Sequence, residues 1–287
     1  MMMSRKSTRK KCWPGMGGVA AIIGCLLAVP MPVIAGAPPT SREVEDVKAA
    51  LPTADDLIAR YIEAIGGADA IRAIKHVTMT GRMEVIGMGM AGPATMHASA
   101  PNYSFAEIEI AGYGKILQGF DGTHGWVIDP ASGPMLLEDA ALAQSERDSR
   151  LHLVLEMEKW YPTRETTEAT EFENEPVYAV KLVNKQGKES THYYHRESGL
   201  QIGSVGTTES PMGEMRTTTV LRDYREVDGM KMPHTLTTRV MGMEQRITIE
   251  RVSTDEIERE QYRAPQQIQA LIDDKKAREQ QEENDES

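Results

Sequence analysis

The feature that most constrains the fold is an alternation of apolar and polar residues that begins at His76. An extended chain points successive side chains to opposite faces, so such alternation predicts strands with one buried face. In the run KHVTMTGRMEV, one face carries Val77, Met79, Gly81, Met83 and Val85. Further short runs recur along most of the chain, rich in the threonine, valine and isoleucine that strands favour. The pattern predicts a mainly β (α+β) fold.

Turn and helix signals organise these strands. The segments 197–199 (Glu-Ser-Gly) and 228–229 (Asp-Gly) predict antiparallel hairpins. Residues 53–74 and 138–160 instead have helical spacing, and Thr53 is a suitable N-cap for the first of them. In the second stretch we expect buried positions at Leu151, Val154, Leu155 and Trp160. Because strands and helices do not alternate, a doubly wound parallel sheet is excluded.

Residues 1–35 have the parts of an export signal. A basic start and an uncharged run precede a small-residue cleavage pattern, with Val33 and Ala35 at the −3 and −1 positions. Two alternatives stay open: the uncharged run is long enough for an uncleaved membrane anchor, and Cys25 ends a run that fits a lipidation signal. Cys12 and Cys25 both lie in this leader, so the cleaved chain has no thiol and depends on its core for stability.

We therefore expect an exported, periplasmic protein with four parts. They are a signal peptide at 1–35, a linker at 36–52, one domain at 53–265 and a charged, disordered tail at 266–287.

The net charge is −11, and removal of the basic leader makes it more negative. Such a chain is repelled by nucleic acid and by anionic membrane surfaces. We expect a monomer that does not bind nucleic acid.

Residues 87–92 read GMGMAG, which has the G-x-G-x-x-G spacing of a dinucleotide-binding loop. A loop of that kind must open a helix, because the N-terminus of the helix holds the pyrophosphate. Here Pro93 follows, and strand alternation resumes at once. The segment is better explained as a hairpin connection whose glycines adopt positive φ.

Methionine is the unusual component, with eighteen residues against three phenylalanines. Two groups of them lie in strand regions, one at 79–96 and the other at 212–243. They can be ordinary core filling, or they can line an adaptable apolar cavity for acyl chains. For the cavity, we expect the inward-facing residues to be Met79, Met83, Val85, Met96, Ile108, Ile110, Trp126 and Met215.

The sequence contains no recognised catalytic or metal-binding motif. His192 and His195 resemble a metal pair, but residues three apart on a strand point to opposite faces. His76 and His97 fall on the polar faces of their strands. We expect no catalytic residue, no metal site and no cofactor, and therefore no enzyme.

Three segments resemble a known family of exported proteins. The run DYREVDGMKMPHTL (223–236), the run GFDGTHGWVIDP (119–130) and the helix-Gly-Gly-helix start at 57–81 resemble the outer-membrane lipoprotein-sorting family of LolA/LolB-like carriers. The resemblance covers roughly residues 50–265. It implies a curved antiparallel sheet that forms an incomplete β-barrel, is covered by helices and has a hydrophobic interior. It also implies a lipid or an acylated lipoprotein as partner.

Two functions are consistent with these observations. One is a non-catalytic periplasmic carrier that binds a lipid or a lipidated protein in an apolar cavity. The other is an envelope scaffold or protein-interaction domain with a fully packed core. A continuous cavity beneath the helices would distinguish the first from the second.

Overall fold

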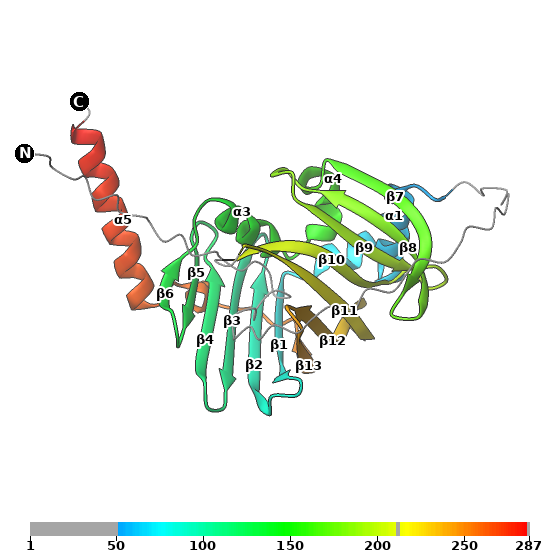
Figure 1. Cartoon of the computed structure of the whole chain (residues 1–287), viewed down its shortest axis with the longest axis horizontal. Coiled ribbons are helices and arrows are strands. Elements are labelled where there is room, and N and C mark those ends of the chain that lie inside the picture. Colours follow the sequence, from blue (N-terminus) through cyan, green and yellow to red (C-terminus); the bar gives the residue numbers. More distant parts are fainter. Residues whose placement is uncertain (1–50, 211–212, 286–287) are drawn as a thin grey trace, which may run out of the picture.

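The structure is a computed structural model that describes residues 51–210 and 213–285 (Figure 1). The expected signal peptide, its alternatives at Cys25 and Ala35, and nearly all of the linker lie outside the described residues. The described chain forms one antiparallel sheet of thirteen strands in the order β6-β5-β4-β3-β2-β1-β13-β12-β11-β10-β9-β8-β7. The strands are β1 (His76–Val85), β2 (Met90–Ser99), β3 (Tyr103–Ile110), β4 (Gly114–Phe120), β5 (Gly125–Asp129), β6 (Gly133–Leu136), β7 (Thr163–Phe172), β8 (Glu175–Val183), β9 (Glu189–His195), β10 (Gln201–Ser210), β11 (Gly213–Val227), β12 (Met230–Val240) and β13 (Met243–Ser253).

The sheet is curved and open. Its first strand, β1, pairs with its last, β13, at the centre, and β6 and β7 are the two unpaired edges of the described sheet. Figure 1 shows β1 to β6 standing side by side while β7 to β11 curl away from them. The predicted fold class, a curved antiparallel sheet forming an incomplete barrel with helices, is confirmed.

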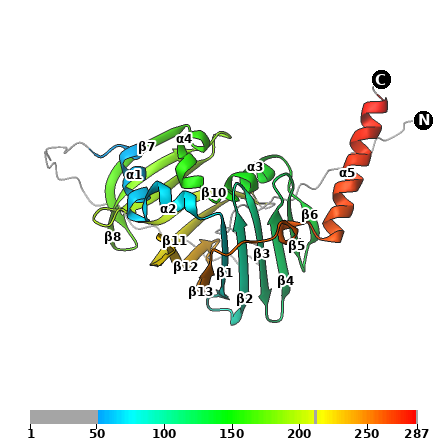
Figure 2. The same cartoon turned by 180° about the vertical axis from the view of Figure 1, so that it is seen from behind.

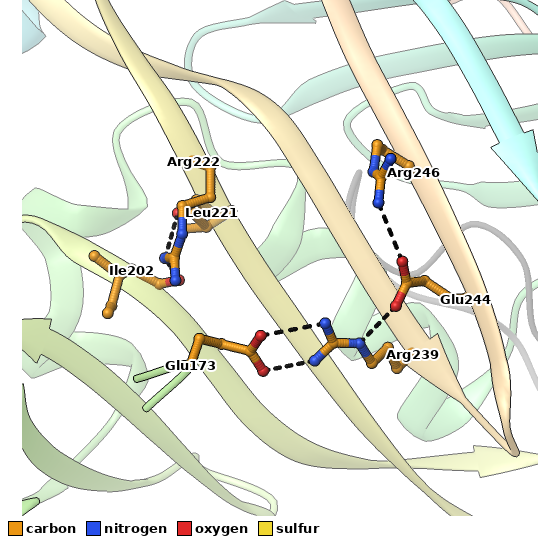
Figure 3. Close-up of polar contacts among 7 residues, drawn as sticks. All are labelled: Glu173, Ile202, Leu221, Arg222, Arg239, Glu244 and Arg246. Atoms are coloured by element: carbon orange, nitrogen blue, oxygen red, sulfur yellow. Dashed lines mark hydrogen bonds and ion pairs between the residues drawn. The ribbon is translucent and has the colours of Figure 1, made fainter. Parts of the chain in front are cut away.

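Polar contacts between β12 and the β7–β8 turn, on the outer side of the sheet, show that the sheet is strongly coiled. Arg239 on β12 makes two hydrogen bonds with Glu173 in the β7–β8 turn, with nitrogen–oxygen distances of 2.6 and 3.2 Å, and a further one of 2.8 Å with Glu244 (Figure 3). The guanidinium of Arg239 lowers the pKa of Glu173. In a flat sheet, β8 and β12 would lie four strand spacings, or about 19 Å, apart. Coiling therefore brings the β7–β8 tip back over the outer face.

The hairpin connections form where the sequence predicts them. Residues 86–89 join β1 to β2, and Gly87 and Gly89 have φ values of 80° and 66°. Asp228 and Gly229 have φ values of 48° and 82° between β11 and β12, as an Asp-Gly hairpin turn requires. The segment 87–92 is thus a hairpin and the start of a strand.

The helices are α1 (Ala54–Ala64), α2 (Gly67–Ala73), α3 (Asp139–Asp148), η1 (Leu153–Glu156), α4 (Met157–Trp160), η2 (Arg259–Tyr262) and α5 (Gln266–Asp285). Thr53 caps α1 through a capping box with Asp56. The second predicted helical stretch is broken into α3, η1 and α4. Only Trp160 among its four expected core residues is buried, and Leu151, Val154 and Leu155 are half-buried.

Residues 137–162 carry the chain from the β6 edge of the sheet to the β7 edge, and we call them the strap. The Nε2 atom of His152 donates a hydrogen bond to the carbonyl oxygen of Ile74 at 2.8 Å, and the hydroxyls of Ser149 and Ser104 are 2.7 Å apart. These contacts lie where β1 and β3 begin. We call this the helical end of the sheet, because α2 also contacts β12 there and Lys231 N of β12 donates a hydrogen bond of 2.8 Å to the carbonyl oxygen of Ile65, the C-cap residue of α1. The opposite end, with the turns 86–89, 111–113 and 241–242, is the turn end.

The chain after β13 returns along the outer face. Figure 2 shows it crossing in front of β1 to β5 before α5 begins, and Tyr262 Oη lies 2.6 Å from Ser99 Oγ. We expected residues 266–287 to be disordered, whereas residues 266–285 form α5. Ile268 and Ile272, one helical turn apart, are buried against Trp126. The charge of the tail had been given more weight than the short amphipathic segment at its start.

Candidate functional site on the inner face of the sheet

The two faces of the sheet follow from strand register. Met79 pairs with Met96, and Met96 with Ala106, so these residues share one face across β1, β2 and β3. Val180 and Leu182 lie on this same face of β8 and pack against α1 and α4. We call it the inner face, and we call the face that carries η2 and α5 the outer face.

A cluster of buried apolar residues covers the central part of the inner face, and we call it the inner apolar cluster. Its buried members are Met83, Val85, Ala94, Met96, Ala106, Ile108, Ile110, Ile116, Ile247 and Ile249. Met83 and Ile108 are 0% exposed. All ten lie on strands, and so do the half-buried residues packed against them, apart from Tyr113 in the β3–β4 turn. Helices of the described chain pack on other parts of this face: α1 and α4 on β8 and β9, and α3 against Gly125 of β5.

Six of the eight residues expected to face inward belong together here. Met83, Val85, Met96, Ile108 and Ile110 are members of the cluster, and half-buried Met79 packs against it. Met215 is buried on β11 but lies outside the cluster. Strand periodicity alone thus indicates most of the residues of this surface.

The inward direction expected for Trp126 is wrong. Trp126 pairs with Gly119, which pairs with Phe105, and this register places the indole on the outer face. There it packs beneath Ile268 of α5, and its ring centroid lies 6.0 Å from that of Phe105. The five-residue strand β5 is too short for its alternation to fix which face points inward.

Apolar side chains are also exposed at the turn end. Met88 in the β1–β2 turn is 47% exposed, and Met241 in the β12–β13 turn is 48% exposed. The hydrogen bond from Ile86 N to Glu244 O, 2.8 Å long, holds these two turns next to each other. The inner apolar cluster is thus bordered at the turn end by exposed thioethers, while the strap borders it at the helical end.

Beside the cluster, a row of polar side chains runs across the inner face, and we call it the polar belt. In strand order from β7 to β13, its members are Thr166, His192, Ser204, Thr219, Thr238 and Gln245, with Val180 standing on β8 between the first two. Thr219, Thr238 and Gln245 are between 5% and 8% exposed. The belt could not be recognised in the sequence, because a threonine in a single strand resembles an ordinary surface residue, and only the cross-strand register shows that these residues form one row.

His192 is a half-buried member of the belt whose ring lies close to the strap. The centroid of its ring lies 6.3 Å from that of Tyr161, and its Nδ1 atom is buried without a hydrogen-bond partner in the described chain. The guanidinium of Arg147 lies over the Tyr161 ring, 5.6 Å from its centroid, and is paired with Asp148 at 2.7 Å. Burial, with a smaller contribution from the charge of Arg147, lowers the pKa of His192 to about 4. His195 points to the outer face, where its Nε2 atom lies 3.6 Å from Glu175 Oε2, so the two histidines lie on opposite faces of the sheet.

Because the pKa of His192 is lowered, the fold should lose stability in mild acid. Above pH 6.5, the ordinary histidine pKa, the ring is neutral in both the folded and unfolded chain. Between pH 6.5 and about 4, His192 is protonated in the unfolded chain but stays neutral in the folded protein. The free energy of unfolding therefore falls as the pH is lowered through this range. We expect the melting temperature to fall less from pH 7 to pH 5 in the His192→Phe variant than in the wild type. Equal losses in the two proteins would contradict the assignment, and His195→Phe is the matched control.

Within residues 51–210 and 213–285, no three His, Cys, Asp or Glu side chains gather as a metal site would require. In the same residues, no helix combines the length and the apolar character needed to span a bilayer. The inner apolar cluster and the polar belt beside it together form the candidate site. The fold and this surface define the class: an open, curved antiparallel sheet with helices on its inner side and a largely apolar inner face.

No protein-family model matches the chain, and no curated protein matches it in sequence. Among solved structures, it is similar to a LolA superfamily protein from Nitrosomonas europaea, with 12% identity, a TM-score of 0.49, and coverage of 75% of this chain and 99% of that one. It is similar to a putative outer-membrane lipoprotein-sorting domain from Vibrio parahaemolyticus, with 10% identity, a TM-score of 0.46, and coverage of 71% and 97%. A DUF1329 family protein from Desulfovibrio piger has 12% identity, a TM-score of 0.46, and coverage of 70% and 93%. The LolA-like resemblance noted in the sequence is thus also found among solved structures.

Proposed function

We propose that this protein is a periplasmic carrier that binds the acyl chains of a lipid or a lipidated protein on its inner face, without bond-making chemistry. The observation that carries the proposal is the inner apolar cluster, which is built from strand residues, whereas the helices of the described chain pack elsewhere on the inner face. An apolar sheet face of this kind needs an apolar second layer, and an acyl chain can supply it.

Methionine makes such a surface adaptable. Met83 and Met96 lie within the cluster, and Met79 and Met90 pack at its margin. Unbranched thioether side chains rearrange at low cost and accept acyl chains of different shape. Each buried methylene group contributes about 0.8 kcal/mol, so several methylenes of one chain suffice for stable binding.

We place ligand access at the turn end. The strap and α2 border the inner face at the helical end, where His152 and Lys231 form hydrogen bonds with backbone carbonyls. The turn end carries exposed Met88 and Met241 instead. An acyl chain arriving there meets apolar side chains before it reaches the cluster.

A second function is favoured by one observation. Met83, Ile108, Val177 and Leu182 are 0% exposed, as they would be in a fully packed core. In that case the protein is an envelope scaffold or interaction domain, and its partner is another envelope protein. The two proposals differ in whether the exported protein retains a lipid.

Native mass spectrometry of the protein, exported to a periplasm and purified without detergent, distinguishes them. Organic extraction of the same sample identifies the passenger. A bound lipid or acylated peptide supports the carrier. A ligand-free mass, together with no uptake of a fluorescent fatty acid, contradicts the carrier and supports the packed scaffold.

A further inference from the structure

We propose that the polar belt binds the head group of the carried amphiphile, and that this head group is uncharged and rich in hydroxyl groups. The inference rests on the proposed function, because it names the part of the ligand that lies beyond the acyl chain. It follows from three observations: the belt adjoins the inner apolar cluster, two of its buried atoms lack hydrogen-bond partners in the described chain, and no unpaired charge lies among the neighbours of His192 considered below.

The belt is continuous with the inner apolar cluster. Gln245, its last member on β13, pairs directly with Val85, a cluster residue on β1. From Gln245 the row continues through Thr238, Thr219 and Ser204 to His192. A ligand whose chain lies on the cluster therefore meets hydrogen-bonding groups on the neighbouring strands. The ligand that matches an apolar surface followed directly by a polar one is an amphiphile, which has an apolar chain and a polar head group.

Two buried atoms at the far end of the belt lack hydrogen-bond partners in the described chain. They are Nδ1 of His192 and Oγ1 of Thr166. Both residues flank Val180 across three adjacent strands, so the two atoms lie on one short stretch of the inner face, beneath α1 and α4, which pack against Val180. Buried polar atoms are nearly always paired, and leaving them unpaired destabilises the fold. A ligand that offers hydroxyl groups can pair with both, since a hydroxyl both donates and accepts hydrogen bonds.

The charges around these atoms favour an uncharged head group. Tyr161 and Arg147 of the strap lie near His192, and the guanidinium of Arg147 is already paired with Asp148 at 2.7 Å. Ser204 and Val180 flank the histidine on the adjacent strands and carry no charge. A buried phosphate needs an uncompensated cation, because a desolvated charge without a partner is costly. Arg147 does not provide one, whereas a sugar or glycerol head group needs none.

The test compares three twelve-carbon probes below their micelle concentrations: dodecyl glucoside, dodecyl phosphate and dodecanol. Binding to the exported full chain is measured by isothermal titration calorimetry at pH 7.5. We expect the glucoside to bind about tenfold more tightly than the phosphate, the ratio that corresponds to one or two hydrogen bonds. Dodecanol, which carries the same twelve-carbon chain and a single hydroxyl group, measures how much the alkyl chain alone contributes to the affinity.

Two variants test the unpaired atoms directly. Thr166→Val and His192→Phe should each weaken glucoside binding about five- to tenfold and change dodecanol binding less than twofold, since each removes one hydrogen-bonding group. Because Thr166→Val removes an unsatisfied buried hydroxyl, its urea midpoint should be equal to or higher than that of the wild type. Thr163→Val, at an exposed position on the same strand, is the control and should change neither quantity.

The outcomes separate this inference from the proposed function. If the phosphate binds as tightly as the glucoside, or if both variants retain full glucoside affinity, the head-group assignment is overturned while the carrier stands. If none of the three probes binds, both are overturned.

Discussion

The variant Met83→Asp should fold and yet retain no apolar ligand. Met83 is 0% exposed, lies between its strand partners Ile247 and Gly92, and belongs to the inner apolar cluster. A carboxylate at this position either stays hydrated, which keeps an acyl chain away, or is buried at a cost of several kcal/mol. We expect the affinity for a fluorescent fatty acid to fall about hundredfold or more, which corresponds to about 2.8 kcal/mol.

Two variants serve as controls. Met83→Leu preserves volume and apolar character, so it should bind nearly as well as the wild type. Met88→Asp introduces the same charge at a 47% exposed position in the adjacent turn and should leave the fold intact. Circular dichroism establishes that each variant is folded. If Met83→Asp does not fold, Met79→Asn repeats the test at a half-buried position packed against the same cluster. Full ligand retention in a folded Met83→Asp protein would refute the carrier.

The variant Gly92→Ala should be strongly destabilised. A Cβ atom at this position would overlap with the backbone carbonyl of Glu109 on the neighbouring strand β3. The clash involves backbone rather than a flexible side chain, so the β2–β3 pairing must separate locally to relieve it. We expect the free energy of unfolding, measured in urea, to fall by about 3 kcal/mol, the upper range for overpacking.

Gly89→Ala is the matched control within the same hairpin. Gly89 has a φ of 66° and nothing within 4 Å of the added Cβ, so its substitution costs only the left-handed backbone conformation. That cost is about 1 kcal/mol. If the two variants lose equal stability, close strand contact at Gly92 is not the reason for its glycine.

Local patterns in the sequence were sufficient for the first strand and for the turns. The alternation from Val77 to Val85 is long enough to fix the inward face, and the cluster at Met83 and Val85 agrees with it. The Asp228-Gly229 turn needs two consecutive positive φ values, which few other residue pairs supply. Thr53 and Asp56 form a capping box that belongs to four consecutive residues. Each of these features depends on near neighbours in the chain.

Features that depend on distant partners could not be predicted in this way. The direction of Trp126 depends on α5, because the indole is buried by residues of that helix more than a hundred positions later. The polar belt exists only as an alignment of seven strands, so no single strand reveals it. Helix α5 itself is highly charged, and its order comes from Ile268 and Ile272 docking on the outer face. Sequence reasoning assigns strands and turns, whereas register and docking determine which surfaces meet.

The pairing of β1 with β13 at the centre of the sheet sets the order in which the protein can fold. The β2–β6 hairpins and the β7–β12 hairpins can each form from neighbouring segments, but the central seam joins the two ends of the domain. Long-range pairing of this kind is slow, because the intervening chain must first be brought together. Until Ile247 and Ile249 arrive, the apolar side of β1 has no partner on that edge. A chain in which this seam has not yet formed exposes the surface that we propose for acyl chains, so ligand binding and closure of the seam involve the same side chains.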